Sequence, residues 1–429
     1  MKSKYKNRIV DDILSNQMKA FGACLIVGPK GCGKTRTAEE KSATNIYFQN
    51  PDKKERYDYI FSTQPSKILN FKKPILFDEW QNYKDVWDLI RLNIDKTARK
   101  GQYLLTGSTS QKVKTLHTGT LRISKIQMYP MSLYESGESN GTVSLKELFI
   151  NPRKYDDLKC DLKYEDYAYL TCRGGWPGIF EIKSKKRKLD IAKTLYKQIY
   201  ESDVESIDKS CPNKILSKQI IDSFSRNICS LVSNKTIYAD IKESNNQGNI
   251  DRYIYALKQL FIIEEIDAWN ANVLSSYAIR SMPKKNLIDP SIATNALNIN
   301  EKFLADNPHI FGSLFESLVI RDLRVYASKY NGVLNYYRDN SGLECDVVLH
   351  WQNGKYALIE IKLGGKMAYV HGIESLNALE QKIKDYNANP KNKRKLALPT
   401  FKMLITADET GFYDKNNKTI VVPLGCLKD

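Results

Sequence analysis

The sequence predicts an α/β protein, in which a parallel sheet with helices on both faces precedes a helical middle and a second α/β domain. In the first third, short apolar stretches that end in polar residues alternate with helix-forming stretches, which is the pattern of a parallel sheet. In the last third, an amphipathic stripe is followed by three strand-like runs separated by turn residues. A chain of 429 residues is long enough for roughly two to four domains.

The first strand leads directly into a phosphate-binding loop. Residues 23–27 (ACLIV) are apolar, and GPKGCGKT follows them before a helix-forming stretch. Glycines let the backbone curl so that its N–H groups face a phosphate, and the helix adds the positive end of its dipole. We expect Lys34 to hold the β- and γ-phosphates of a nucleotide and Thr35 to bind Mg²⁺. The predicted nucleotide-binding residues are Gly28, Pro29, Lys30, Gly31, Cys32, Gly33, Lys34, Thr35 and Arg36.

A second strand, within KKPILFDEWQNY, ends in two acids. Residues 74–77 are its apolar part, and Asp78 and Glu79 follow. Asp78 fits the Mg²⁺-supporting carboxylate of a Walker B element, and Glu79 fits the base that polarises the attacking water. Acids also favour the first turn of a helix, which is the alternative interpretation. The phosphate-binding loop earlier in the sequence favours the catalytic interpretation.

A third strand, residues 102–106 of GQYLLTGSTS, ends in Thr-Gly-Ser. Its end resembles the sensor-1 position of AAA+ proteins, where Thr106 or Ser108 would sense the γ-phosphate. A turn capped by a serine is the alternative. Arg122 follows, where a trans-acting arginine is often found.

The middle of the sequence contains no group of residues typical of a catalytic site. Residues 214–270 contain three short helical patterns and then a β-like tail, an order that fits a winged helix. Its third helix, residues 249–260, would be the recognition helix if it bound DNA, although it is only mildly basic. Packing or oligomerisation is the alternative role.

Near the C-terminus, Glu360 and Lys362 lie two residues apart on one strand and therefore share a face. A three-residue hairpin loop at 352–354, with a left-handed glycine, would place Asp346 opposite Glu360 and Glu344 opposite Lys362. A two-residue loop would turn Asp346 to the other face. We expect the three-residue loop, and Glu316 could reach the group from the preceding amphipathic helix.

Asp346 and Glu360 could bind Mg²⁺ beside Lys362, which is an arrangement for phosphodiester hydrolysis. The order Glu316, Asp346, Glu360-x-Lys362 resembles the PD-(D/E)xK restriction-endonuclease-like fold, except that Cys345 replaces the proline. The predicted catalytic residues are Glu79, Asp346, Glu360 and Lys362. An inactive domain that keeps the fold is the alternative.

The whole chain resembles a prokaryotic family of AAA+-type P-loop ATPases whose C-terminal domain of unknown function contains a winged helix and an endonuclease-like core. The matching segments are GPKGCGKT, ILFDEW, LLTGS, GGWPG, NLIDPSIA, FES, YYRDNSGLECDVV and LIEIK. The resemblance implies ATP rather than GTP, and the chain shows no Asn-Lys-x-Asp element for guanine. It implies an ATPase core at 1–150, a helical connector at 151–210, a winged helix at 211–300 and a nuclease-like domain at 301–429.

The composition of the chain indicates which partners it binds and in which cellular compartment it is located. The formal charge of +17 favours a nucleic acid, chiefly DNA, or reflects a genome biased toward lysine codons. Eight scattered cysteines without Cys-x-x-Cys argue against a zinc site and for reduced thiols in the cytoplasm. No stretch is apolar enough to span a membrane. We therefore expect an ATP- and Mg²⁺-dependent hydrolase acting on or near DNA. The alternative is a nucleotide-dependent switch for protein partners or self-association, with an inactive nuclease fold.

Overall fold

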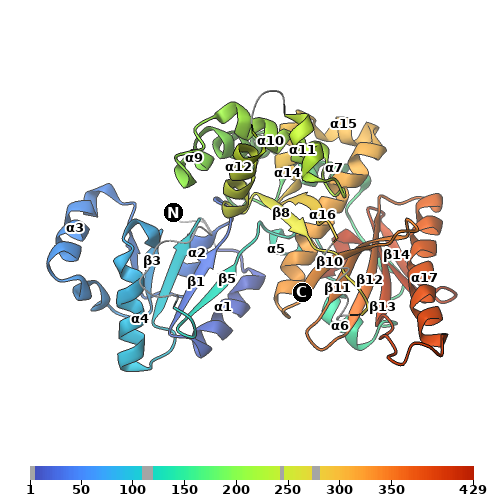
Figure 1. Cartoon of the computed structure of the whole chain (residues 1–429), viewed down its shortest axis with the longest axis horizontal. Coiled ribbons are helices and arrows are strands. Elements are labelled where there is room, and N and C mark those ends of the chain that lie inside the picture. The colour runs from blue at the N-terminus through green and yellow to red at the C-terminus, as the bar shows by residue number, and fades with distance from the viewer. Residues whose placement is uncertain (1–4, 109–118, 242–245, 273–280) are drawn as a thin grey trace. The chain divides into compact units, whose positions relative to one another are not determined.

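The computed structural model describes residues 5–108, 119–241, 246–272 and 281–429 (Figure 1). The chain divides into two compact units. The first comprises residues 1–130 with 256–261, and the second comprises 131–255 with 262–429. The first unit therefore ends before residue 150, where the sequence placed the end of the ATPase core.

The first unit is built on a five-stranded, all-parallel sheet, as the sequence predicted. The strand order is β2-β3-β4-β1-β5, so the third strand of the motif series lies between the strands that carry the loop and the acids. The strands are β1 (Ala23–Val27), β2 (Thr44–Tyr47), β3 (Ile75–Asp78), β4 (Tyr103–Gly107) and β5 (Ile123–Gln127).

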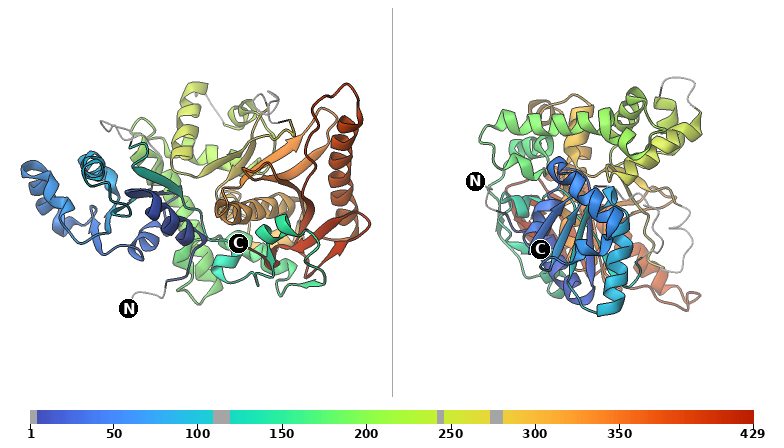
Figure 2. Two further views of the ribbon diagram at one scale, coloured as in Figure 1. Left: turned by 90° about the horizontal axis from the view of Figure 1, so that it is seen from below. Right: turned by 90° about the vertical axis from the view of Figure 1, so that its left-hand side faces the viewer.

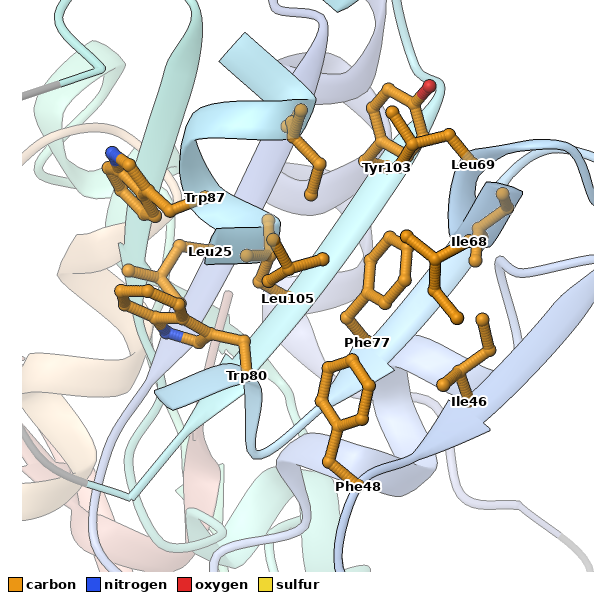
Figure 3. Close-up of a cluster of buried hydrophobic side chains, with 14 of the residues drawn as sticks. Leu25, Ile46, Phe48, Ile68, Leu69, Phe77, Trp80, Trp87, Tyr103 and Leu105 are labelled. Atoms are coloured by element: carbon orange, nitrogen blue, oxygen red, sulfur yellow. The ribbon is translucent and has the colours of Figure 1, made fainter. Parts of the chain in front are cut away.

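Both faces of this sheet are apolar, because successive side chains of a strand point to opposite faces. Odd-numbered residues such as Phe77 and Leu105 pack with Trp80 and Trp87 on one face (Figure 3). Even-numbered residues of the same strands pack with Leu14 on the other face. The helices of the unit are α1 (Ile9–Ala20), α2 (Lys34–Glu39), α3 (Lys54–Thr63) and α4 (Asp85–Thr97).

Residues 131–150 belong to the second unit because their hydrogen bonds lie there. They form α5 (Leu133–Ser136), β6 (Val143–Ser144) and α6 (Leu145–Ile150). The N–H of Leu133 donates to Asp322 at 2.9 Å, and β6 pairs with the last strand, β16 (Leu427–Lys428).

A seven-stranded mixed sheet forms the C-terminal part of this unit, in the order β10-β11-β12-β13-β15-β14-β7. Helix α16 (Pro308–Ser328) lies on one side of it and α17 (Lys366–Ala388) on the other (Figure 2). The edge strand β7 comes from the predicted helical connector, where the sequence indicated a continuous helix. The strands are β7 (Leu158–Lys159), β10 (Val333–Arg338), β11 (Glu344–His350), β12 (Tyr356–Lys362), β13 (Phe401–Thr406), β14 (Thr410–Asp414) and β15 (Thr419–Pro423).

Helices dominate the middle of the chain. Three of them, α10, α11 and α12, precede β8, which is the element order predicted for residues 214–270, and β8 pairs with β9 beyond that range. The elements are α7 (Tyr164–Arg173), α8 (Lys185–Gln198), a π-helical turn (Ile199–Asp203), α9 (Val204–Ile207), α10 (Lys214–Arg226), α11 (Asn234–Asp240), α12 (Gln247–Gln259), β8 (Ile263–Ile266), β9 (Lys284–Leu287), α14 (Pro290–Ala296) and α15 (Glu301–Asp306). Short 3-10 turns lie at Pro51–Lys53, Pro65–Leu69, Trp80–Asn82, Pro177–Ile179 and Leu424–Cys426.

A fully buried arginine ties distant segments of the second unit together. Arg321 pairs with Asp322 at 2.7 Å and with Asp289 at 3.1 Å. Asp289 also accepts the N–H of Gly175 at 2.9 Å. Breaking such a buried pair leaves an uncompensated charge, so these contacts fix how the segments pack. They account structurally for GGWPG and NLIDPSIA.

Among the residues described, no helix is long and apolar enough to cross a membrane.

Candidate functional site

The phosphate-binding loop follows β1 and leads into α2, in the strand–loop–helix order that the motif requires. Gly31 and Gly33 have φ of 79° and 103°, which only glycine adopts without strain. A Cβ added at Gly28 would lie 2.2 Å from the carbonyl oxygen of Met128, so only glycine fits there. The backbone geometry therefore explains the three glycines.

Lys34 is buried, and its ammonium group lies inside the loop. Nζ donates to the carbonyl oxygens of Gly28 and Pro29, both at 2.9 Å. The cation is thus held at the mouth of the loop by neutral acceptors. The Cys32 side chain is buried in the core, and Arg36 pairs with Glu39 and Glu40 on its own helix. Neither side chain therefore contributes directly to the loop's interior.

Arg8, which the sequence did not single out, clamps the loop from outside. Its guanidinium donates to the carbonyl oxygens of Cys32 at 3.0 Å and Tyr129 at 2.9 Å. In a trans peptide the C=O and the following N–H point in opposite directions. Holding the Cys32 carbonyl outward therefore directs the N–H of Gly33 inward.

The Walker B carboxylate lies within hydrogen-bond reach of the loop. Asp78 accepts hydrogen bonds from Thr35 at 2.7 Å and from Thr106 at 2.6 Å. The hydroxyl of Thr106 also accepts the N–H of Glu79 at 3.1 Å. Burial raises the pKa of Asp78, and these hydrogen bonds oppose that rise. Thr106 therefore positions Asp78, and its predicted role as a phosphate sensor stays a prediction.

Both oxygens of Glu79 are held. The hydroxyl of Ser108 donates to one at 2.6 Å, and the amide of Gln81 donates to the other at 2.5 Å. Glu79 has φ 52° and ψ 52°, a left-handed conformation uncommon for a residue with a Cβ. Gln81 was not predicted, because nothing in the motif marks the residue two positions after the acid.

The oxygen donors here fit Mg²⁺, which prefers carboxylates, hydroxyls and phosphate oxygens. Thr35 and Asp78 supply a hydroxyl and a carboxylate side by side, next to the loop that would hold the phosphates. The group therefore has the chemistry of the predicted metal site.

Arg122 lies at the opposite edge of the sheet from the loop. Its carbonyl oxygen accepts the N–H of Ala23, the first residue of β1, at 3.2 Å. Because β1 and β5 are parallel, Arg122 is at their amino ends while the loop follows the carboxyl end of β1. Its guanidinium pairs with Asp95 at 2.8 Å. The structure therefore does not bring Arg122 to the loop of its own chain.

The C-terminal hairpin has the predicted three-residue loop. His350 pairs with Tyr356 and Val347 with Ile359, which leaves residues 352–354 as the turn. Gly354 has φ 82°, as a left-handed position requires. The expected loop is confirmed.

Lys362 bridges the two predicted carboxylates. Its Nζ lies 2.6 Å from Glu360 and 3.1 Å from Asp346, and Asp346 also accepts the N–H of Ile361 at 2.9 Å. Burial raises the pKa of Glu360 well above its usual value, with Asp346 adding to it. Burial also disfavours ionised Asp346, but the ammonium groups of Lys362 and Lys284 outweigh it, so the pKa of Asp346 is lowered.

Lys284 of β9 is a further member of this cluster and was missed in the sequence. Its side chain is only 1% exposed, and Nζ lies 2.8 Å from Glu316 and 3.4 Å from Glu344. Glu316 therefore pairs with Lys284 and not with Asp346 or Glu360. Glu316 thus reaches the charged group from its helix through Lys284. A Cβ added at Gly372 of α17 would lie 3.7 Å from the Cβ of Glu360, so α17 covers that residue.

This donor set does not fit a divalent ion as it is arranged. The ammonium group of Lys362 lies between the carboxylates of Glu360 and Asp346. The ammonium group of Lys284 neutralises Glu316 and Glu344. Among the described residues, no group of three or more His, Cys, Asp or Glu side chains is placed to hold a metal. The cluster is a buried, charge-compensated network.

Three family models match successive segments of the chain. A family model described as an AAA domain matches residues 20–137. Two models of domains of unknown function, DUF8612 and DUF4143, match residues 164–302 and 311–427. With the loop geometry, the first match defines the N-terminal unit as an ATPase-like domain of the P-loop class.

Several known proteins resemble the chain at low sequence identity. Uncharacterized proteins of Mycobacterium bovis and Mycobacterium tuberculosis are each 20% identical over 343 residues, which is 79% of this chain and 69% of theirs. A Walker-type ATPase of Pyrococcus abyssi is 14% identical, with a TM-score of 0.42 over 68% of this chain and 96% of that one. A replication initiator DnaA bound to AMPPCP and single-stranded DNA is 14% identical, with a TM-score of 0.28 over 60% of this chain and 90% of its own.

Proposed function

We propose that the protein binds and hydrolyses ATP with Mg²⁺, and that this reaction governs the action of the second unit on or near DNA. The observation that carries the ATPase proposal is the buried ammonium group of Lys34, held by two carbonyl oxygens inside a glycine loop. A buried cation without a carboxylate partner is costly unless an anion joins it. A nucleotide phosphate supplies that anion.

The residues around the loop have separate roles in hydrolysis. Lys34 and the loop N–H groups orient the phosphates, while Thr35 and Asp78 would hold Mg²⁺, which neutralises phosphate charge when bound. Glu79, fixed by Ser108 and Gln81, accepts a proton from the attacking water. The hydroxyl of Thr106 hydrogen-bonds to Asp78 and to the backbone N–H of Glu79, and so fixes their positions relative to each other.

Phosphate release from ATP tests this proposal. We expect turnover with Mg²⁺ and none with excess chelator, and Asp78→Asn lowers the rate by about 10- to 100-fold because the supporting charge is lost. Control reactions use Asp58→Asn, since Asp58 lies on the exposed surface of the same unit and binds Lys54 and Tyr83. Absence of turnover in the wild type with every nucleoside triphosphate would refute the proposal.

For the second unit, the charged cluster favours the non-catalytic alternative over a nuclease. The ammonium group of Lys362 contacts one oxygen of Glu360 and one of Asp346, and it offsets the charge that would attract a metal ion. We propose that this domain keeps a nuclease-like arrangement as a structural core and acts through binding. DNA stays the proposed partner because the chain carries a formal charge of +17.

Plasmid nicking decides between the two interpretations. We expect supercoiled plasmid to remain intact with Mg²⁺ or Mn²⁺ at any protein concentration. Nicking that disappears in Glu360→Ala and Lys362→Ala but persists in Lys34→Ala would establish the nuclease and overturn the non-catalytic interpretation.

A further inference from the structure

Helix α8 carries an unusual concentration of uncompensated positive charge. Its sequence, KKRKLDIAKTLYKQ, contains six basic residues and one acid, Asp190. In the part of the chain that the structure describes, the side chains of Lys186, Arg187 and Lys193 are exposed and make no hydrogen bond or ion pair. Other surface helices pair their lysines, as Lys54 does with Asp58 and Lys218 with Asp222, both at 2.6 Å.

The charges of α8 also lie where a helix disfavours them. The positive end of the helix dipole lies at the N-terminus, where acids are stabilising and bases are not. The first four residues of α8 are all basic, and its first turn contains no acid. Asp190, one turn further along, is the single acid of the helix, so an external polyanion would offset most of this repulsion.

The basic stripe of α8 comprises Lys186, Arg187 and Lys193, whose side chains are exposed. Lys186 and Lys193 lie seven residues apart on one side of the helix, with Asp190 between them, and Lys197 further along pairs with Glu201 at 3.7 Å. The stripe runs along about 10 Å at a rise of 1.5 Å per residue. Ala192 and Tyr196, which lie about 100° round the helix from the lysines that follow them, are buried and anchor the helix.

We infer that this stripe binds the phosphate backbone of a nucleic acid. The inference rests on the proposed nucleic-acid partner and names the surface that meets it. Lysine is a compact point charge on a flexible stem, which suits sequence-independent contacts with phosphates. An interfacial membrane helix would need a free apolar side, and in α8 Ala192 and Tyr196 are buried while Leu189, Ile191 and Leu195 are partly buried.

The helix predicted for DNA recognition, α12, is a poorer candidate. Its exposed residues include Asp251 beside Arg252, so the charges there cancel. Tyr253 is buried, and its hydroxyl accepts the N–H of Asn213 at 2.8 Å. Asp251 accepts the hydroxyl of Tyr238 at 2.6 Å.

A matched pair of triple variants tests the inference. Lys186→Gln, Arg187→Gln and Lys193→Gln remove two lysines and one arginine from α8. Lys391→Gln, Lys393→Gln and Arg394→Gln remove the same charges from an exposed loop after α17. Binding of a fluorescent 30-base-pair duplex is measured by anisotropy across a series of salt concentrations, with circular dichroism and ATP binding as checks of folding.

We expect the α8 variant to lose at least about tenfold in affinity at 0.1 M salt. The slope of log affinity against log salt should fall by about 3, because the variant neutralises three fewer phosphates and releases fewer counterions on binding. The loop variant should bind within about twofold of wild type, with its slope unchanged.

Three outcomes overturn the inference. Equal losses in both variants would show a general charge effect, and wild-type binding by the α8 variant would show that another surface is used while the nucleic-acid partner stands. If the wild type binds anionic vesicles but no duplex, both the inference and the proposed nucleic-acid partner fail.

Discussion

Replacing Glu79 by glutamine should stop ATP hydrolysis while leaving ATP binding intact. We expect the turnover rate to fall by about a hundred- to ten-thousand-fold, because the amide cannot accept a proton from water. Binding should stay within about threefold of wild type, since the phosphates are held by Lys34 and the loop. Phosphate release and the affinity for a fluorescent ATP analogue measure the two effects separately.

Two further variants sharpen this result. Lys34→Ala should lose binding as well as turnover, which separates the phosphate-holding residue from the base. Glu39→Gln is the matched control, because Glu39 is also a hydrogen-bonded carboxylate near the loop, bound to Arg36 and Tyr47. Turnover near the wild-type rate in Glu79→Gln would show that another group activates the water.

The parts of this site that were predictable are those encoded in contiguous sequence. Gly28 to Thr35 form one motif, and Asp78 and Glu79 end a recognisable strand. The hairpin at 352–354 was also predictable, because Asn353-Gly354 constrains the turn and the turn sets which side chains share a face. In each case local geometry determines the result.

Two of the residues that were missed, Arg8 and Lys284, act across long sequence separations, whereas Gln81 acts on Glu79 two residues away. Arg8 reaches the carbonyl of Tyr129, and Lys284 meets Glu344 from another strand. Such contacts depend on which elements dock together, and neither composition nor periodicity specifies docking. The role of Arg122 as a trans-acting arginine stays a prediction, because its position before a parallel strand shows only that it lies away from the loop of its own chain.

Lys284→Met should destabilise the second unit by about 3–5 kcal/mol, because it leaves the buried carboxylate of Glu316 without its partner. Methionine keeps the length of the side chain, so the effect comes from lost charge and not from a cavity. The midpoint of the urea transition should be followed with a probe specific to this unit, because a chain of two units need not unfold in one step.

Two variants test the cause. Lys284→Met combined with Glu316→Leu should recover most of the loss, since an apolar pair of similar size replaces a buried ion pair at little cost. Lys218→Met is the surface control in the same unit, because its partner Asp222 is 32% exposed, against 14% for Glu316, and is solvated after the lysine is lost. Equal destabilisation by both single variants would show that the effect is not due to a stranded buried charge.

The free energy of unfolding of the second unit should depend on pH in the direction set by the pKa of Glu316. Burial raises the pKa of Glu316 to about 7, with Asp346 adding to the rise and Lys284 opposing it. Between its ordinary value of 4.5 and about 7, the folded state therefore binds a proton that the unfolded state releases. The stability that Glu316 contributes is therefore complete below pH 4.5 and is lost as the pH rises to about 7. Asp346, whose pKa is lowered, acts in the opposite sense only at more acidic pH.

Lys284→Met makes this dependence stronger. Without the ammonium group the pKa of Glu316 rises further, so the carboxyl stays protonated at pH 5 and its burial costs little. We therefore expect the destabilisation by Lys284→Met to be large at pH 8 and mostly absent at pH 5, as measured by the unfolding midpoint at both values. A loss that is equal at the two pH values would mean that Lys284 stabilises the unit by packing, and the cluster would then not be held together by its charges.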